Sequence, residues 1–305
     1  MSDSISDTSE QFDDLVVEPC LEIHEFEESA PRASFNGFLK DAPTANTSVV
    51  NGLSQQLIYQ INLIVPNALV SFDDLDVELG SAAYPFVPPA AKLALQKAIE
   101  KRGRKLVVNS AYRTLAQQML LFNGKKRGEN PNPVAAPGTS NHQSGLALDI
   151  EDRQGWLPFL NGTGWQPLAG DPPHIDYRGA GAKDLRRETI LAFQQLWNKN
   201  NPTEQIGEDG RWGTKTESAL NRSPAMGFEK APWDSTPRIL RLSRPLMEGS
   251  DVRKLQEKLQ AAGFTIAVAD GVFGAETQRA VKEFQQQKGL VVDGLAGAKT
   301  LELIA

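Results

Sequence analysis

Two of the three histidines stand beside carboxylates in the middle of the chain. His142 lies in Ser-Asn-His-Gln-Ser-Gly-Leu-Ala-Leu-Asp (140–149), and His174 lies in Asp-Pro-Pro-His-Ile-Asp (171–176). The imidazoles of His142 and His174 and the carboxylate of Asp149 can bind one metal ion and leave a coordination position open for water. Such a donor set is typical of a catalytic zinc site and predicts metal-assisted chemistry in this part of the chain.

The three candidate ligands need a bend in the chain to meet. Leucine and isoleucine alternate with Ala147 and Asp149 over residues 146–150, so a strand there points Asp149 away from its apolar face. His142 precedes Asp149 by seven positions, an odd offset that puts it on the wrong face of a continuous strand. Gly145 lies between them and allows the bend that brings the two side chains together.

A second carboxylate near His174 is expected to act as general base, because metal-bound water attacks best once it is deprotonated. Asp171 is the favoured candidate. Pro172 and Pro173 prevent a regular helix after it and hold it in a fixed turn beside His174. Asp176 is the competitor, since position i+2 shares a strand face with His174.

The segments around these residues predict an α+β domain over 35–230, in which a small antiparallel sheet with helices carries the site. Two prolines mark the start of one helix and Gly103 marks its end. Glycine, proline and asparagine are frequent over 123–139, which predicts a long loop. The expected strands are 71–79, 105–109, 146–150 and 175–177, and the expected helices are 90–102, 115–122 and 183–200.

The C-terminal half contains an internal repeat. The pattern Asp-Gly-x-x-Gly-x-x-Thr occurs at 209–216, 270–277 and 293–300. Asp-Gly favours a tight turn, the second glycine permits close backbone approach, and the threonine lies just inside the next helix. The predicted repeating unit is therefore helix, Asp-Gly turn and helix. Its first copy, over about 184–222, is expected to pack on the preceding domain.

Residues 240–305 resemble the peptidoglycan-binding domain, a small three-helix module found on many wall hydrolases. The resemblance implies an all-α three-helix domain over 238–305 that binds the wall polymer, joined by a linker over 231–237 that contains two prolines. Leu255, Leu259, Val281 and Phe284 are expected in its core. The residues that carry the resemblance include Gly249, Val252, Gln256, Asp270, Gly271, Phe273, Thr277, Gln285, Asp293, Gly294 and Thr300.

Three motifs in the first two thirds of the chain resemble the zinc D-alanyl-D-alanine carboxypeptidases and peptidoglycan endopeptidases of the M15, or LAS, metallopeptidase group. Ser-x-His-x-x-Gly-x-Ala-x-Asp is matched at 140–149, and acid-x-x-His is matched at 171–174. Upstream, Ser-Ala-Tyr-Arg-Thr at 110–114, followed by two glutamines, resembles the segment that supplies a substrate-orienting arginine. The motifs occur in the expected order within about 71–228.

The resemblance implies a role for each matched residue. Arg113 would polarise the scissile carbonyl and its oxyanion, and Ser140 would help to position the substrate. Asp171 would be the general base, although many members have glutamate there, and the shorter aspartate changes the distance to the water. The implied Zn²⁺ ligands are His142, Asp149 and His174.

The expected activity is hydrolysis of stem peptides of peptidoglycan, with D-Ala-D-Ala carboxypeptidase favoured. One alternative is an L-Ala-D-Glu-type endopeptidase, and another is a wall-binding protein whose peptidase domain is inactive. A non-haem iron oxygenase also uses two histidines and a carboxylate. That last alternative leaves both the second carboxylate and the C-terminal repeat unexplained.

Composition and charge limit the remaining classes. A chain of 305 residues, 40% hydrophobic and 23% charged, suits two or three globular domains. No uninterrupted apolar run approaches the roughly 18 residues of a membrane span. Cys20 is the one cysteine, which excludes an internal disulfide and a cysteine metal cluster. Lysine and arginine do not form a patch among aromatic residues, so no nucleic-acid partner is expected.

The acidic residues are concentrated at the start of the chain. Residues 1–30 hold ten of the 38 acids and no lysine or arginine, which leaves 28 acids against 32 bases, a net charge of +4, for the rest. Residues 1–34 are therefore expected to form a disordered tail. A basic start and an apolar run typical of a secretory signal are missing. A periplasmic or wall-associated location is inferred from the peptidoglycan substrate alone, and a monomer is expected.

Overall fold

The computed structural model describes residues 35–80, 83–234 and 237–304, so the predicted acidic tail lies outside the described residues. Among these residues, no helix has the length and apolar character needed to cross a membrane. The larger helices are α1 (Asn51–Ile64), α2 (Pro89–Arg102), α3 (Leu115–Lys126), α4 (Arg153–Leu160), α5 (Arg186–Asn200), α6 (Thr214–Asn221), α7 (Ser250–Ala261), α8 (Ala275–Gln287) and α9 (Ala298–Leu303).

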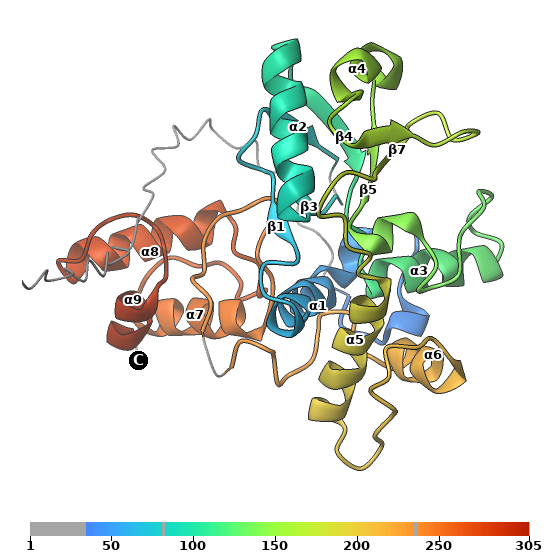
Figure 1. Cartoon of the computed structure of the whole chain (residues 1–305). Coiled ribbons are helices and arrows are strands. Elements are labelled where there is room, and N and C mark those ends of the chain that lie inside the picture. Colours follow the sequence, from blue (N-terminus) through green and yellow to red (C-terminus); the bar gives the residue numbers. More distant parts are fainter. Residues whose placement is uncertain (1–34, 81–82, 235–236, 305) are drawn as a thin grey trace, which may run out of the picture. The chain divides into compact units, whose positions relative to one another are not determined.

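A five-stranded sheet in the order β2-β4-β5-β7-β6 lies at the centre of the first two thirds of the chain (Figure 1). The pairs β4–β5, β5–β7 and β6–β7 are antiparallel, as predicted. The pair β2–β4 is parallel instead, because the chain between these strands crosses over through α2. The strands are β2 (Val77–Leu79), β4 (Leu106–Ser110), β5 (Ala147–Ile150), β6 (Trp165–Pro167) and β7 (His174–Tyr177), and a separate pair joins β1 (Val70–Ser71) to β3 (Phe86–Val87).

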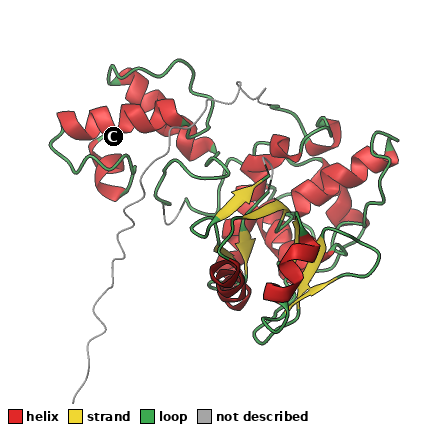
Figure 2. Cartoon of the chain, turned by 90° about the horizontal axis from the view of Figure 1, so that it is seen from above, coloured by secondary structure: helices red, strands yellow, loops and turns green. Residues whose placement is uncertain are grey.

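The two faces of this sheet differ in chemistry. Leu148 and Ile150 of β5 and Ile175 of β7 are buried in a core shared with α2 and α4. Because side chains alternate along a strand, the neighbouring Asp149 and His174 project from the opposite face. A second view shows the strands and the helices that surround them (Figure 2). The predicted direction of Asp149 is thus confirmed.

A second core joins the helices that do not cover the sheet. Buried apolar residues of α1, α3, α5 and α6 form one cluster, which includes Leu53, Met119, Phe193 and Leu220. The helix pair α5–α6 contains the first copy of the Asp-Gly repeat, so this copy packs with α1 and α3.

Each repeat unit has a buried glutamine at its centre. In all three units the glutamine Nε2 donates to the turn aspartate, to a main-chain carbonyl and to the helix threonine, while its Oε1 accepts from the turn glycine N–H. The turn glycines have φ values of 66°, 80° and 75°, which favour glycine. The sets are Gln194 with Asp209, Arg211, Thr216 and Gly210; Gln256 with Asp270, Val272, Thr277 and Gly271; and Gln285 with Asp293, Leu295, Thr300 and Gly294.

The C-terminal region is all-helical among its described residues, as predicted. Helices α7, α8 and α9 surround one apolar core. Leu255, Leu259, Val281 and Phe284 are buried in it, which confirms the expected core. The linker predicted over 231–237 starts with three buried residues, Ala231, Pro232 and Trp233.

Two predicted boundaries are wrong. The loop expected from residue 123 begins later, because α3 continues to Lys126; Asn123 donates to Asn221, and Gly124 packs closely on Thr44. These tertiary contacts outweigh the weak helix propensity of Asn-Gly. The strand expected over 71–79 is interrupted after Ser71, whose hydroxyl accepts from the Asp73 N–H and forms a local turn. Helices α1 and α4 and strand β6 were not anticipated.

Candidate metal centre

The three predicted metal ligands come from three different elements. His142 lies in a 3₁₀ turn, Asn141–Ser144, while Asp149 lies in β5 and His174 in β7. Gly145 ends the turn with φ 77°, the left-handed bend that the sequence predicts between His142 and Asp149. Strand register places Asp149 directly opposite His174 in the antiparallel pair.

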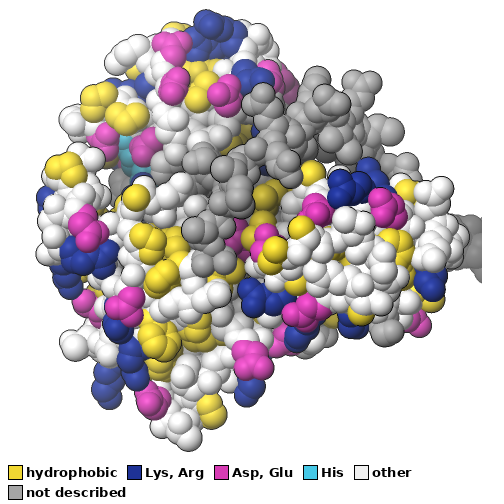
Figure 3. All heavy atoms as spheres, turned by 180° about the vertical axis from the view of Figure 1, so that it is seen from behind, with side chains coloured by type: hydrophobic (Ala, Val, Ile, Leu, Met, Phe, Trp, Pro, Cys, Tyr) yellow, Lys and Arg dark blue, Asp and Glu magenta, His cyan; other side chains and the backbone are white. Residues whose placement is uncertain are grey.

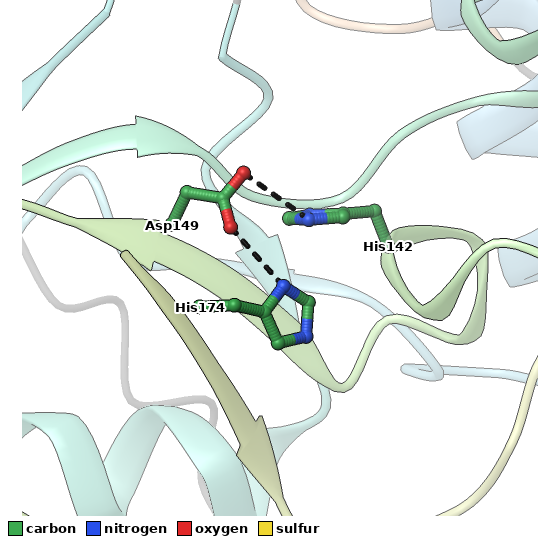
Figure 4. Close-up of side chains that lie close together, drawn as sticks. All are labelled: His142, Asp149 and His174. Atoms are coloured by element: carbon green, nitrogen blue, oxygen red, sulfur yellow. Dashed lines mark hydrogen bonds and ion pairs between the residues drawn. The ribbon is translucent and has the colours of Figure 1, made fainter. Parts of the chain in front are cut away.

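The three side chains converge on one point. Asp149 lies between the two imidazoles (Figure 4), with its Oδ2 3.3 Å from His142 Nε2 and its Oδ1 3.1 Å from His174 Nδ1. The rings are nearly perpendicular, with centroids 5.0 Å apart. One ligand atom from each residue lies within 4.8 Å of the others, a spacing that can hold a metal ion.

Each histidine uses its remaining nitrogen to contact a second group. His142 Nδ1 lies 2.9 Å from the Ala111 carbonyl oxygen, and His174 Nε2 lies 2.9 Å from Asp176 Oδ1. Such partners fix the tautomer and the orientation of a metal-binding imidazole. The free nitrogens, His142 Nε2 and His174 Nδ1, are therefore the ones directed at Asp149.

Burial and charge have opposite effects on the ionisable groups of this cluster. Burial alone would raise the pKa of Asp149, but hydrogen bonds from His142 and His174 hold it well below its usual range. Burial alone would lower the pKa of His174, but its bonds to Asp149 and Asp176 raise it to about 9. Without a metal, the site therefore keeps an ionised carboxylate beside an imidazolium.

The two candidate bases lie on different sides of the His174 ring. Asp171 Oδ2 is 4.0 Å from Nδ1, the nitrogen that faces Asp149, and its side chain is half exposed. Asp176 contacts Nε2 on the opposite edge, is buried, and also contacts Asn141 and Arg178. Asp171 thus borders the space between the three candidate ligands, and Asp176 supports the ring from behind.

Arg113 reaches the centre through Ser110. Its Nη2 donates to Ser110 Oγ at 3.1 Å and its Nη1 to Gln118 Oε1 at 3.3 Å, while Ser110 Oγ lies 3.4 Å from His142 Nδ1. Burial lowers the pKa of the guanidinium, and the charge of Asp149 opposes that shift. Both Ser110 and Arg113 line a cavity of about 190 Å³.

No hydrogen bond given by the structure among the described residues joins the Ser140 side chain to the three candidate ligands. Ser140 is buried at the N-cap of the turn that carries His142, and its carbonyl oxygen accepts from the Gln143 N–H. The structure therefore brings it next to His142 along the chain, and its predicted substrate role stays a prediction.

The centre is open on one side of the molecule. Histidine atoms are visible at the surface between acidic side chains in Figure 3, and His142 and His174 are the histidines among the described residues. A substrate carbonyl can therefore approach the cluster from that side.

Two supporting groups escaped the sequence analysis. The Ala111 carbonyl is main chain, so no residue type could indicate it. Asn141 donates to Asp176 at 3.3 Å and lies inside the motif that contains His142. Its amide side chain beside His142 was the one feature of the sequence that could have indicated this role.

Comparisons with known proteins match two separate stretches of the chain. Residues 89–161 match the family model described as D-alanyl-D-alanine carboxypeptidase, and residues 248–304 match that of a peptidoglycan binding domain. The first match includes Arg113, His142 and Asp149 and ends before His174.

Similar proteins are named as wall enzymes. N-acetylmuramoyl-L-alanine amidase CwlL of Bacillus licheniformis is 34% identical over 125 residues, which cover 37% of this chain and 34% of the amidase. A spore cortex-lytic enzyme of Bacillus cereus is 50% identical over 56 residues, or 18% of this chain and 22% of that enzyme. The LdcB LD-carboxypeptidase structure is 24% identical with a TM-score of 0.31, and the match covers 43% of this chain and 75% of that one.

This chain spans about a third of the length of the amidases that it matches. The two family matches are therefore more informative than these relatives. Each match covers a separate stretch of the sequence, and each stretch contributes residues to a separate apolar core. The chain is thus similar to the D-alanyl-D-alanine carboxypeptidase family over residues 89–161, which include two of the three candidate ligands, and to the peptidoglycan binding domain over residues 248–304.

Proposed function

We propose that this protein is a zinc-dependent peptidase that hydrolyses stem peptides of peptidoglycan, most specifically the terminal D-Ala-D-Ala bond. The observation that carries the proposal is the convergence of His142, Asp149 and His174 with the half-exposed Asp171 beside them. Two neutral imidazoles and one carboxylate are the donor set of catalytic zinc sites.

Both the residue types and the hydrogen bonds that orient them suit a zinc ion. His142 Nε2, His174 Nδ1 and an Asp149 oxygen would hold it, and Ala111 and Asp176 fix the two rings from the outer side. When bound, zinc supplies a Lewis acid and lowers the pKa of a coordinated water.

Asp171 would act as the general base. Its carboxylate borders the space between the ligands, so it can accept a proton from an attacking water and return it to the leaving amine. Asp176 is unsuited to this role because it contacts the edge of His174 that faces away from Asp149.

Arg113 would bind the developing negative charge of the substrate. Its guanidinium is largely buried and its hydrogen-bond partners, Ser110 and Gln118, are neutral, so its positive charge is available to an oxyanion. The match of residues 89–161 to the D-alanyl-D-alanine carboxypeptidase family favours a carboxypeptidase over an endopeptidase. Ser140 would contribute to substrate positioning.

The C-terminal domain would hold the enzyme on the wall polymer. A module matched to peptidoglycan-binding domains raises the local substrate concentration without altering the chemical step. We accordingly place the protein at the cell wall, with peptidoglycan as both substrate and anchor.

The test is hydrolysis by the full chain after metal removal with a chelator and after return of zinc. Release of D-alanine from a pentapeptide ending in D-Ala-D-Ala should require zinc. Parallel assays with an L-Ala-D-Glu substrate decide between carboxypeptidase and endopeptidase. A zinc-loaded protein that cleaves neither peptide, yet sediments with purified sacculi, would be the inactive wall-binding protein.

A further inference from the structure

We propose that Arg153 is a positioning residue that holds the segment 168–174, and with it Asp171 and His174, against the metal centre. Its catalytic consequence rests on the proposed function, whereas its effect on metal affinity does not. Arg153 is the first residue of α4 and follows Asp149 by four positions.

Three main-chain carbonyls of one short segment converge on the Arg153 guanidinium. Its Nη1 lies 3.1 Å from the Leu168 oxygen, 2.8 Å from the Asp171 oxygen and 3.2 Å from the His174 oxygen. Two of these carbonyls belong to the candidate base and to a candidate ligand. A shift of the guanidinium would therefore displace both functional side chains.

The segment cannot hold this shape by its own backbone bonds alone. Pro172 and Pro173 have no N–H, so two donors are missing between Asp171 and His174. The bonds that remain are His174 N–H to the Asp171 carbonyl and Leu168 N–H to the His174 carbonyl, each 3.2 Å long. Arg153 supplies the donors that the prolines lack and closes the loop from inside.

The surroundings of Arg153 are unusual for a purely structural arginine. Its Nε is buried and makes no hydrogen bond within the described part of the chain. Burying a guanidinium nitrogen without a partner costs free energy that an apolar side chain would not incur. This cost is understandable if the Nη1 group, whose two N–H bonds are shared among three carbonyl oxygens, is needed to hold those carbonyls in place.

The position of Arg153 in the sequence also connects Asp149 to the segment 168–174. Asp149 is anchored by β5, and Ile150 N–H at the end of that strand donates to the Pro173 carbonyl at 3.0 Å. The Arg153 side chain adds a second connection from the same stretch of chain to the same segment. One continuous piece, 149–153, thus provides a ligand and fixes the position of the other ligand and the base.

Arg153→Met tests this by keeping an unbranched apolar stem and removing the donors. Zinc affinity, measured by competition with a chelator, should weaken roughly 10–100-fold, and kcat on the D-Ala-D-Ala peptide should fall by a similar factor with KM nearly unchanged. The absorption spectrum of the Co²⁺-substituted protein should also change. Arg153→Lys, which keeps a charged donor, should recover part of both losses.

Arg102→Met is the matched control. The Arg102 guanidinium lies 4.3 Å from the ring of Trp156, which belongs to the same helix α4, and it pairs with Asp152. Within the described residues, its hydrogen bond goes to Asp152 and not to the segment 168–174. Because the Arg102 side chain is only 9% exposed, its loss should lower thermal stability. Zinc affinity, the Co²⁺ spectrum and kcat should stay within about twofold of the parent, since Arg102 shares no partner with the metal centre among the described residues.

The inference is overturned if Arg153→Met binds zinc and turns over substrate like Arg102→Met, with only thermal stability reduced. Should Arg153→Met fail to fold, Arg153→Ala assayed with added guanidinium ion replaces it: recovery of zinc affinity by guanidinium and not by ammonium supports the role, and no recovery in a folded protein refutes it. An inactive parent protein would contradict the proposed function alone, because the zinc-affinity comparison remains valid.

Discussion

The candidate metal centre and the three-helix module each contain a cluster of polar side chains. The two clusters differ in how far apart their members lie along the sequence. His142, Asp149 and His174 come from a turn and two strands, and the bond that joins His174 to Asp149 spans 25 positions of the chain. In the module, Gln285 bonds partners only 8 to 15 positions ahead. The first centre is built from ionisable side chains alone, whereas the second is built around a neutral glutamine amide that bonds one carboxylate.

The difference shows what each region depends on. The metal centre requires the pairing of β5 with β7, since that register sets Asp149 opposite His174. Each glutamine centre requires only a helix and the turn that follows it, which is why the same four bonds recur around Gln194, Gln256 and Gln285. Loss of the side-chain contacts in one centre should therefore leave those of the other largely intact.

The strongest test of this separation is His174→Ala. Loss of one of three ligands should abolish zinc binding and peptide hydrolysis, because the remaining pair cannot complete the site. Metal content per chain and D-alanine release measure both effects. Sedimentation with sacculi should be unchanged, and full zinc content in this variant would refute the ligand assignment.

The second test separates the two aspartates beside His174. Asp171→Asn should lower turnover by roughly 10²–10⁴-fold with zinc still bound, as expected for loss of a general base. Asp176→Asn should instead weaken zinc binding by roughly 10–100-fold, because Asp176 orients the His174 ring. The opposite pattern would transfer the role of base to Asp176.

The third test uses pH on the metal-free protein. The pKa of His174 is raised to about 9 from the ordinary 6.5, so its stabilising charge is fully present below about pH 6.5 and is lost as pH rises through 9. Unfolding free energy should fall by on the order of 2–3 kcal/mol over this range. All five tryptophans precede residue 234, so their fluorescence in urea reports the domain that holds His174.

The control for this titration is the zinc-loaded protein. A metal-bound imidazole is already neutral, so the fall in stability between pH 6.5 and 9 should be much smaller with zinc bound. An equal fall with and without zinc would show that another group causes the pH dependence.

The test with the smallest expected effect compares alanine variants of two equivalent glutamines. Gln285→Ala should destabilise the C-terminal module by roughly 1–3 kcal/mol and weaken sedimentation with sacculi, while hydrolysis of a soluble peptide stays the same. Gln194→Ala removes the matching bonds beside α1 and should lower the tryptophan-detected transition instead. If both variants changed the same transition, the two regions would not be independent.

The sequence alone was sufficient for features that depend on neighbouring residues. The Asp-Gly repeat predicted the three turns, and the resemblance to the peptidoglycan-binding domain predicted Leu255 and Phe284 in the module core. In the domain that holds the candidate metal centre, alternation along 146–150 predicted the direction of Asp149, and Gly145 predicted the bend after His142. These are local consequences of backbone geometry and of residue type.

Other features depended on contacts that local patterns cannot encode. Helix α3 continues through Asn123 and Gly124 because Asn221 and Thr44 pack against them. The carbonyls that converge on Arg153 carry no signature in residue type, since every residue has one. Sequence spacing left Asp171 and Asp176 as competing bases. Only the fold places Asp171 near His174 Nδ1 and Asp176 at Nε2, because strand pairing and the turn after Asp171 decide which edge of the imidazole each carboxylate meets.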